Sequence, residues 1–106
     1  MLGCENTLSG AGVGVLGGAG NTVSGIGSTI SGGQINTASG ESSSVSGGDT
    51  NTAQGMRSSV SGGESNSAEG TGSYVSGGYF NKASGGAATV SGGQQNSATT
   101  LSLINH

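Results

Sequence analysis

The sequence predicts an all-β fold, a parallel β-solenoid or β-roll built from 15-residue coils with two short strands in each coil. Three observations lead to this fold class. The 106 residues align almost completely when they are written in rows of fifteen, which gives about seven coils. Within each row, small and branched side chains recur in steps of two, the period of a β-strand. Glycines separate these stretches at positions suited to turns.

The first predicted strand of each row begins at an asparagine column. Its members are Asn6, Asn21, Asn36, Asn51, Asn66, Asn81 and Asn96. A small or branched residue follows each Asn after two positions, and in most rows a Gly follows two positions later, so all three face inward. Stacked amides can hydrogen-bond along the axis and also bind turn carbonyls. We therefore interpret the column as a structural ladder rather than as a sugar or metal site.

The second predicted strand of each row contains a column of branched residues. They are Val15, Ile30, Val45, Val60, Val75 and Val90. A double Gly follows this strand, and a single Gly column that includes Gly40 and Gly55 follows the first strand. We expect both sets to adopt positive φ in turns. A helix is excluded because each Gly would cost about 1 kcal/mol in a helix interior and no apolar stripe of helical period is present.

Such short strands cannot pair usefully within one row, so each is expected to pair with parallel neighbours in the coils above and below. Residues 1–106 then form one solenoid domain. We expect a partial capping coil at 1–14, regular repeats at 15–98 and a C-terminal cap or tail at 99–106. Larger apolar residues near both ends are expected to cover the open core: Leu8, Val13, Leu16 and Val23 at the first, and Leu101, Leu103 and Ile104 at the second.

The composition excludes several classes of protein. Leu, Ile, Val and Phe contribute 17 residues, too few for a compact core, yet the net charge of −3 is too small to indicate disorder. Arg57 and Lys82 stand alone, so no nucleic-acid partner is expected. No apolar run is long enough to span a membrane, and any export signal or anchor is expected outside this segment. The single Cys4 cannot form an internal disulfide and does not indicate a compartment.

No enzymatic activity, cofactor or metal is expected. Cys4 and His106 lie near opposite ends of the sequence, and no base is placed to activate the many serines. Gly12–Gly17 matches the dinucleotide pattern G-x-G-x-x-G, but the strand-to-helix context that gives this pattern its meaning is missing. Asp49 is the only Asp, which is incompatible with a repeated calcium site.

The outward positions contain the candidate binding residues. The first strands present a hydroxyl-rich face that would be the ice-binding face of an ice-binding protein: Thr7, Thr22, Ser24, Thr37, Ser39 and Thr52. Gln54, Glu69 and Lys82 interrupt this array. The aromatic residues cluster within seven positions, and aromatic anchors are favoured in recognition and subunit contacts. Together with apolar residues in turns they form a candidate ligand patch or subunit seam: Tyr74, Tyr79, Phe80, Ile26, Ile35 and Met56.

The run V-S-G-G-D-T-N-T-A-Q-G-M-R-S-S at residues 45–59, and each row like it, resembles the head repeats of YadA-like trimeric autotransporter adhesins. The resemblance covers nearly the whole chain, although the usual repeat of the family is one residue shorter. It implies a left-handed β-roll that assembles as a homotrimer. It also implies an extracellular or cell-surface location and a ligand on another surface, either a protein or a glycan.

Asn21–Gly25 also fits the N-x-V-x-G repeat of grass-type ice-binding proteins, which the chain resembles on the same columns. This second resemblance implies the same left-handed β-roll but ice as the partner. Three functions therefore follow from the sequence. We expect an extracellular adhesin or fibre head module, with an ice-binding solenoid as the first alternative and a structural spacer as the second.

Overall fold

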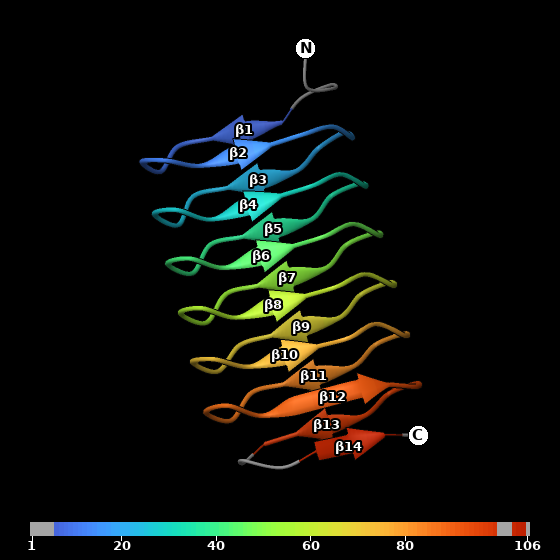
Figure 1. The fold of residues 1–106 in the computed structure, drawn as a ribbon. Coiled ribbons are helices and arrows are strands. Elements are labelled where there is room, and N and C mark those ends of the chain that lie inside the picture. The colour runs from blue at the N-terminus through green and yellow to red at the C-terminus, as the bar shows by residue number, and fades with distance from the viewer. Residues whose placement is uncertain (1–5, 100–102, 106) are drawn as a thin grey trace.

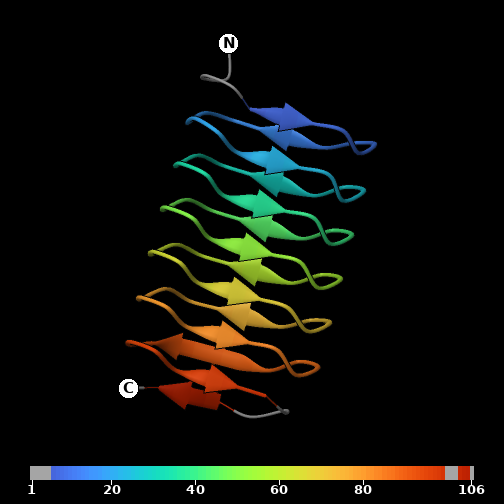
Figure 2. The ribbon, with the colours of Figure 1, turned by 180° about the vertical axis from the view of Figure 1, so that it is seen from behind.

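The computed structural model, which describes residues 6–99 and 103–105, is a parallel β-solenoid (Figures 1 and 2). Successive coils stack along one axis into a flattened rod of 38 × 22 × 12 Å. Two parallel sheets of seven strands each run along the rod. The predicted fold class is confirmed: the strands are short, parallel and two to a coil. No helix that could span a membrane occurs in the described part of the chain.

One sheet, here the odd sheet, contains the first strand of each coil. Its members are β1 (Thr7–Leu8), β3 (Thr22–Val23), β5 (Thr37–Ala38), β7 (Thr52–Ala53), β9 (Ser67–Ala68), β11 (Lys82–Ala83) and β13 (Ser97–Ala98). The second strands form the even sheet. Its members are β2 (Gly14–Val15), β4 (Thr29–Ile30), β6 (Ser44–Val45), β8 (Ser59–Val60), β10 (Tyr74–Val75), β12 (Thr89–Gly92) and β14 (Leu103–Asn105).

The register of the sheets follows the sequence repeat. Thr22 pairs with Thr37, and Thr37 pairs with Thr52, so equivalent residues of successive coils lie side by side. The last coil departs from this rule because Thr89 pairs with Leu103, fourteen residues later, and the register shifts again between Val90 and Gly92. The chain between β13 and β14 is therefore one residue shorter than the corresponding connection in the other coils.

The core between the sheets consists of small and branched side chains in columns. The branched column of the even sheet is fully buried against the Ala and Val column of the odd sheet. Asn and Ser fill the other buried side-chain positions, so two of the four interior side-chain columns are polar. The residues expected to cover the N-terminal end behave differently from one another. Val23 is buried, Val13 packs against the core, Leu8 is 42% exposed in its inward column, and Leu16 faces outward with 75% exposure.

The turns form the two narrow edges of the rod. Edge A contains the turns at residues 9–13, 24–28, 39–43, 54–58, 69–73 and 84–88, on the left in Figure 1, and edge B contains those at 16–21, 31–36, 46–51, 61–66, 76–81 and 93–96, on the right. Edge B carries a third ladder of single bridges that the sequence did not predict, in which Gln34 pairs with Asp49 and Asp49 with Glu64. Successive turns are thus hydrogen-bonded to one another.

Positive φ occurs in the turns, but not at all the glycines for which it was predicted. The second Gly of each double Gly adopts it, as at Gly48 (φ 90°). The column of Gly40 and Gly55 does not, so that prediction is wrong. These glycines are needed for close approach: a Cβ on Gly40 would overlap the carbonyl oxygen of Gly55 and lie 2.6 Å from its carbonyl carbon. Their column sets how closely the coils stack.

Positive φ is also found at non-glycine residues near the end of eight of the turns. Arg57 (φ 58°) on edge A and Phe80 (φ 55°) on edge B are examples. The backbone amides of both residues donate to the preceding coil, Arg57 to the Glu41 carbonyl at 2.7 Å and Phe80 to the Glu64 carbonyl at 3.0 Å. These bonds offset the roughly 1–2 kcal/mol that the left-handed conformation costs.

Candidate binding surfaces

The asparagine ladder lies at the boundary between the odd sheet and edge B, and each of its side chains connects its own turn of edge B to the next. The Asn36 side-chain oxygen accepts a hydrogen bond from the backbone amide of Asn51 at 2.8 Å. The Asn36 amide nitrogen donates to the carbonyls of Gly32 (3.1 Å) and Gly48 (3.0 Å). From Asn21 to Asn81 the side chains are at most 1% exposed. The ladder therefore holds the turns together and offers no surface to a ligand.

The outer face of the odd sheet carries the predicted threonine array. The threonines of β1, β3, β5 and β7 are in direct register, and Ser24 and Ser39 stand two residues after their threonines with exposed side chains. Thr22, Thr37 and Thr52 are half-buried, as expected for residues flanked by neighbouring coils. The structure thus brings together the residues predicted for an ice face: Thr7, Thr22, Ser24, Thr37, Ser39 and Thr52.

A charged group ends this array. Lys82 of β11 lies 3.6 Å from a carboxylate oxygen of Glu69, and the Ser67 hydroxyl donates to the other carboxylate oxygen at 3.0 Å. Both ends of the ion pair are substantially exposed, so its contribution to stability is small. The pair matters for recognition, because the odd face is uncharged over its first four strands, where Gln54 alone replaces a hydroxyl residue, and is charged at β9 and β11.

The outer face of the even sheet is made almost entirely of Ser and Thr. Among the described side chains the exceptions are Gly14 and Leu16 at the N-terminal end and Tyr74 of β10, which is 37% exposed. The phenol oxygen of Tyr74 lies 2.7 Å from the Ser61 hydroxyl of the preceding coil. Hydrogen bonds from Ser61 and, to a smaller degree, Ser76 lower the pKa of Tyr74 below its usual value. This face has no charged side chain among the described residues.

The candidate seam of aromatic and apolar residues is not gathered in one place. Ile26 and Met56 lie on edge A, whereas Ile35, Tyr79 and Phe80 lie on edge B. The exposed turn residues therefore do not form one patch on the surface of a single chain. The reason is their phase in the repeat: Ile26 and Ile35 are nine residues apart in the same coil, which places them in turns at opposite edges of a flattened coil.

Edge B nevertheless keeps an apolar group of its own. The Tyr79 and Phe80 rings meet edge to face, with centroids 4.4 Å apart and an interplanar angle of 72°. Phe80 is 49% exposed and Ile35, three coils away in the same column, is 59% exposed. Thr50 and Ser65 occupy the positions between them. Tyr74 projects from the even face and is separate from this edge group.

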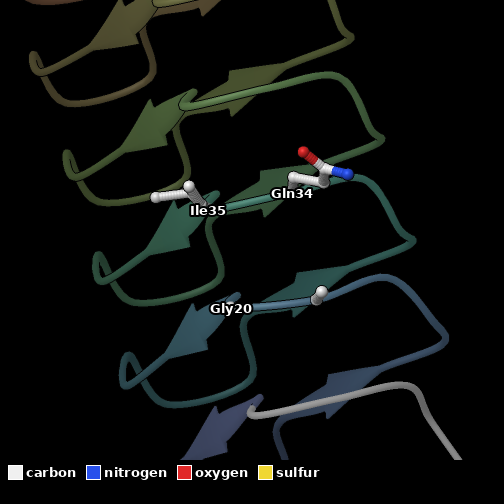
Figure 3. Close-up of a pocket in the computed structure, with 4 residues that line it drawn as sticks. Gly20, Gln34 and Ile35 are labelled. Atoms are coloured by element: carbon white, nitrogen blue, oxygen red, sulfur yellow. The ribbon is translucent and has the colours of Figure 1, made fainter.

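A shallow hollow also lies on edge B, lined by Ala19, Gly20, Gln34 and Ile35 (Figure 3). It exists because the first complete turn of edge B has the small residues Ala19 and Gly20 where later turns have larger ones. The Gln34 and Ile35 side chains diverge in Figure 3, so no polar groups converge on the hollow. Nor do the described residues bring together three or more His, Cys, Asp or Glu side chains in an arrangement that could hold a metal ion.

Cys4 and Leu101 lie outside the described residues, as does His106, and the side chains of Leu103 and Ile104 are likewise not described. The predicted C-terminal cap therefore stays a prediction. Searches with this chain matched neither a protein-family model nor a curated protein sequence.

Proposed function

We propose that this protein is a surface-binding module, an extracellular adhesin or fibre head that attaches to a protein or glycan on another surface. The observation that carries the proposal is the register of the outward side chains. Threonines of four successive strands lie side by side on the odd face, and serines and threonines line the even face in the same way. A rigid face that repeats one chemical group suits a target that also repeats, because many weak contacts then add up.

The proposal includes assembly as a homotrimer, as the resemblance to YadA-like head repeats implies. The apolar group of edge B supports a subunit contact, since exposed aromatic residues are enriched in interfaces. Tyr79 and Phe80 are its centre, and Ile35 extends it along the same edge. The module acts without catalysis and without a cofactor, and it functions outside the cell or at the cell surface.

Light scattering of the purified protein tests the assembly. We expect a trimer, and we expect the double variant Tyr79→Gln, Phe80→Gln to dissociate into monomers while keeping its β-sheet circular dichroism. The substitution is compatible with the fold because Gln94 and Gln95 occupy the same two columns one coil later. Met56→Thr is the matched control on edge A, where Thr71 occupies the same column. A monomeric wild-type protein would contradict the trimer.

Ice binding is the second candidate function, and the aligned threonines of the odd face favour it. An ice-binding surface requires regularly spaced hydroxyl and methyl groups on a rigid plane, and β1 to β7 provide four such rungs. Inhibition of ice recrystallisation tests it, with Thr37→Lys expected to abolish the effect. Lys82 shows that this column accepts a lysine. Ser44→Lys on the even face is the control, and an equal loss in both variants would contradict a threonine face. A protein that binds neither ice nor a surface would be a spacer.

A further inference from the structure

The even face differs from every other surface of the described chain in having no charge. Glu41 and Arg57 lie on edge A, Asp49 and Glu64 on edge B, and the Glu69–Lys82 pair on the odd face. The outward positions of β4, β6, β8 and β12, and the positions directly after β4, β6 and β8, are all Ser or Thr. Each hydroxyl both donates and accepts hydrogen bonds. The face therefore offers a regular field of neutral groups with one aromatic ring among them.

The Tyr74 ring lies along this face instead of standing upright on it. The Cα of Tyr74 is paired with that of Ser59, and Ser61 is two residues further along the same neighbouring coil. Ser61 is therefore displaced by about 7 Å along the strand and about 5 Å across it. The 2.7 Å contact between the phenol oxygen and the Ser61 hydroxyl requires the ring to lean over the sheet toward Ser61. The hydrogen bond thus holds the ring over the sheet, while Tyr74 stays 37% exposed to solvent.

A partly exposed aromatic ring that is held in place among hydroxyl groups suits the ring of a neutral sugar. Sugar C–H groups carry slight positive charge and pack against the negative face of an aromatic ring. The hydroxyl groups of the sugar can replace water on neighbouring Ser and Thr side chains, which lie one strand spacing apart on either side of Tyr74 at Ser59 and Thr89. Nucleic acids, anionic lipids and acidic glycans would find no cation on this face.

We propose that the even face around Tyr74 binds an uncharged polysaccharide, with one sugar ring stacked on Tyr74 and its neighbours hydrogen-bonded to the flanking hydroxyl groups. The proposal rests on the surface-binding function proposed above and names the ligand class for one of the two faces. It also separates two roles that the aromatic residues could share: Tyr74 contacts the ligand, whereas Tyr79 and Phe80 belong to edge B and the subunit contact. Ser59, Ser61, Ser76 and Thr89 complete the subsite.

Titration calorimetry with cellohexaose, chitohexaose and mannohexaose tests the proposal, with the acidic polysaccharide alginate as the charged comparison. We expect saturable binding of at least one neutral oligosaccharide, little changed by added salt because no ion pair is formed. Tyr74→Ser should weaken that binding about tenfold or more. This variant restores the residue found at Ser44 and Ser59 in the same column, so it should fold. Gln54→Ala, an exposed change that lies outside both the even face and edge B, is the control and should bind like the wild type.

Three results would overturn the proposal: no saturable binding of any neutral probe, unchanged binding by Tyr74→Ser, or binding of alginate alone. Tyrosine fluorescence provides a second readout, since the chain has no Trp and two Tyr residues. In the Tyr79→Gln variant the signal comes from Tyr74 alone and should change on addition of the oligosaccharide. Failure of glycan binding at Tyr74 can be distinguished from failure of the proposed adhesin function. A trimer that adheres to a surface but binds no neutral glycan would leave the adhesin proposal standing.

Discussion

The side-chain oxygen of Asn51 accepts a hydrogen bond from the backbone amide of Asn66, 2.9 Å away in the next coil. The ladder therefore passes from side chain to main chain at every step and does not run from amide to amide. The Asn51 amide nitrogen donates to the carbonyls of Gly47 (3.0 Å) and Gly63 (2.9 Å). One buried side chain thus supplies hydrogen-bond partners to three backbone groups at the turns of edge B.

Asn51→Ala removes all three of these hydrogen bonds and leaves a void in a fully buried position. Each unsatisfied buried backbone group costs about 1–3 kcal/mol, and water can reach some of the turn carbonyls, so we expect a loss of roughly 3 kcal/mol. Urea unfolding followed by circular dichroism measures it. Gln54→Ala, an exposed change three residues away, should stay within about 0.5 kcal/mol. Equal effects of the two substitutions would contradict a structural role for the ladder.

Asn51→Asp keeps the shape of the side chain and the bond to Asn66, but it places a carboxylate against the Gly47 and Gly63 carbonyls. Burial and these carbonyls raise the pKa of the new carboxyl in the folded state above its unfolded value near 4. A raised folded pKa favours folding below the unfolded pKa, and that stabilisation is lost as pH rises through the folded pKa. We therefore expect the loss in free energy of unfolding, relative to the wild type, to be smaller at about pH 3 than at about pH 7. Urea unfolding at the two pH values measures it.

The fold and the ladder could be predicted because the sequence repeats its inward residues in every coil. An Asn that recurs in every coil, as Asn36 and Asn51 do, points to a structural role that is the same in each coil. A single Asn could have many different roles. The inward phase of the strand then places the side chain in the core. The same phase could have separated Ile26 from Ile35, since turn residues nine positions apart in a two-strand coil belong to opposite edges.

Other features could not be predicted because they depend on how closely the coils stack. The sequence shows that Gly40 is needed but does not distinguish a positive φ from a close approach to the next coil, and the second is the cause. Nor does it indicate that bulky residues such as Arg57 and Phe80 adopt the left-handed conformation, because hydrogen bonds between turns stabilise that choice. Tyr74 was identified as a candidate, but its lean toward Ser61 appears only in three dimensions.

Two glycine substitutions distinguish close approach from backbone flexibility. In Gly40→Ala the new methyl group would overlap the Gly55 carbonyl of the next coil and would lie 2.7 Å from the Gln54 carbonyl oxygen. Because backbone atoms cannot move aside singly, we expect a loss of more than about 4 kcal/mol or no soluble fold. Gly47→Ala meets no atom within 4 Å and needs no positive φ, so it should be neutral or stabilise by up to about 1 kcal/mol. Thermal unfolding of the two variants measures the difference, and similar losses would argue against coil spacing as the cause.

The buried serines of the column that ends in Ala88 differ in their hydrogen bonds. The Ser58 hydroxyl donates to the Gly55 carbonyl at 2.7 Å, whereas the buried Ser43 hydroxyl has no partner among the described residues. Ser58→Ala should cost about 1 kcal/mol, and Ser43→Ala should be neutral or slightly stabilising because it removes a polar group that is buried without compensation. Ala88 is itself fully buried, so the column accepts a methyl group. Urea unfolding of the two variants measures their free energies of unfolding. A larger loss of stability in Ser43→Ala than in Ser58→Ala would contradict this prediction.

Ionisation of Tyr74 reports directly on its contact with Ser61. Hydrogen bonding by Ser61 lowers the pKa of the Tyr74 phenol, so Ser61→Ala should raise the midpoint of its titration. The absorbance of tyrosinate measures this in a Tyr79→Gln background, where one tyrosine remains. Because the folded pKa is lowered, any stabilisation from this group is present only above the unfolded pKa near 10 and is lost as pH falls through the folded value. Ser61→Ala should therefore leave stability at neutral pH nearly unchanged, and an unaltered titration midpoint would show that the phenol does not rest on Ser61 in solution.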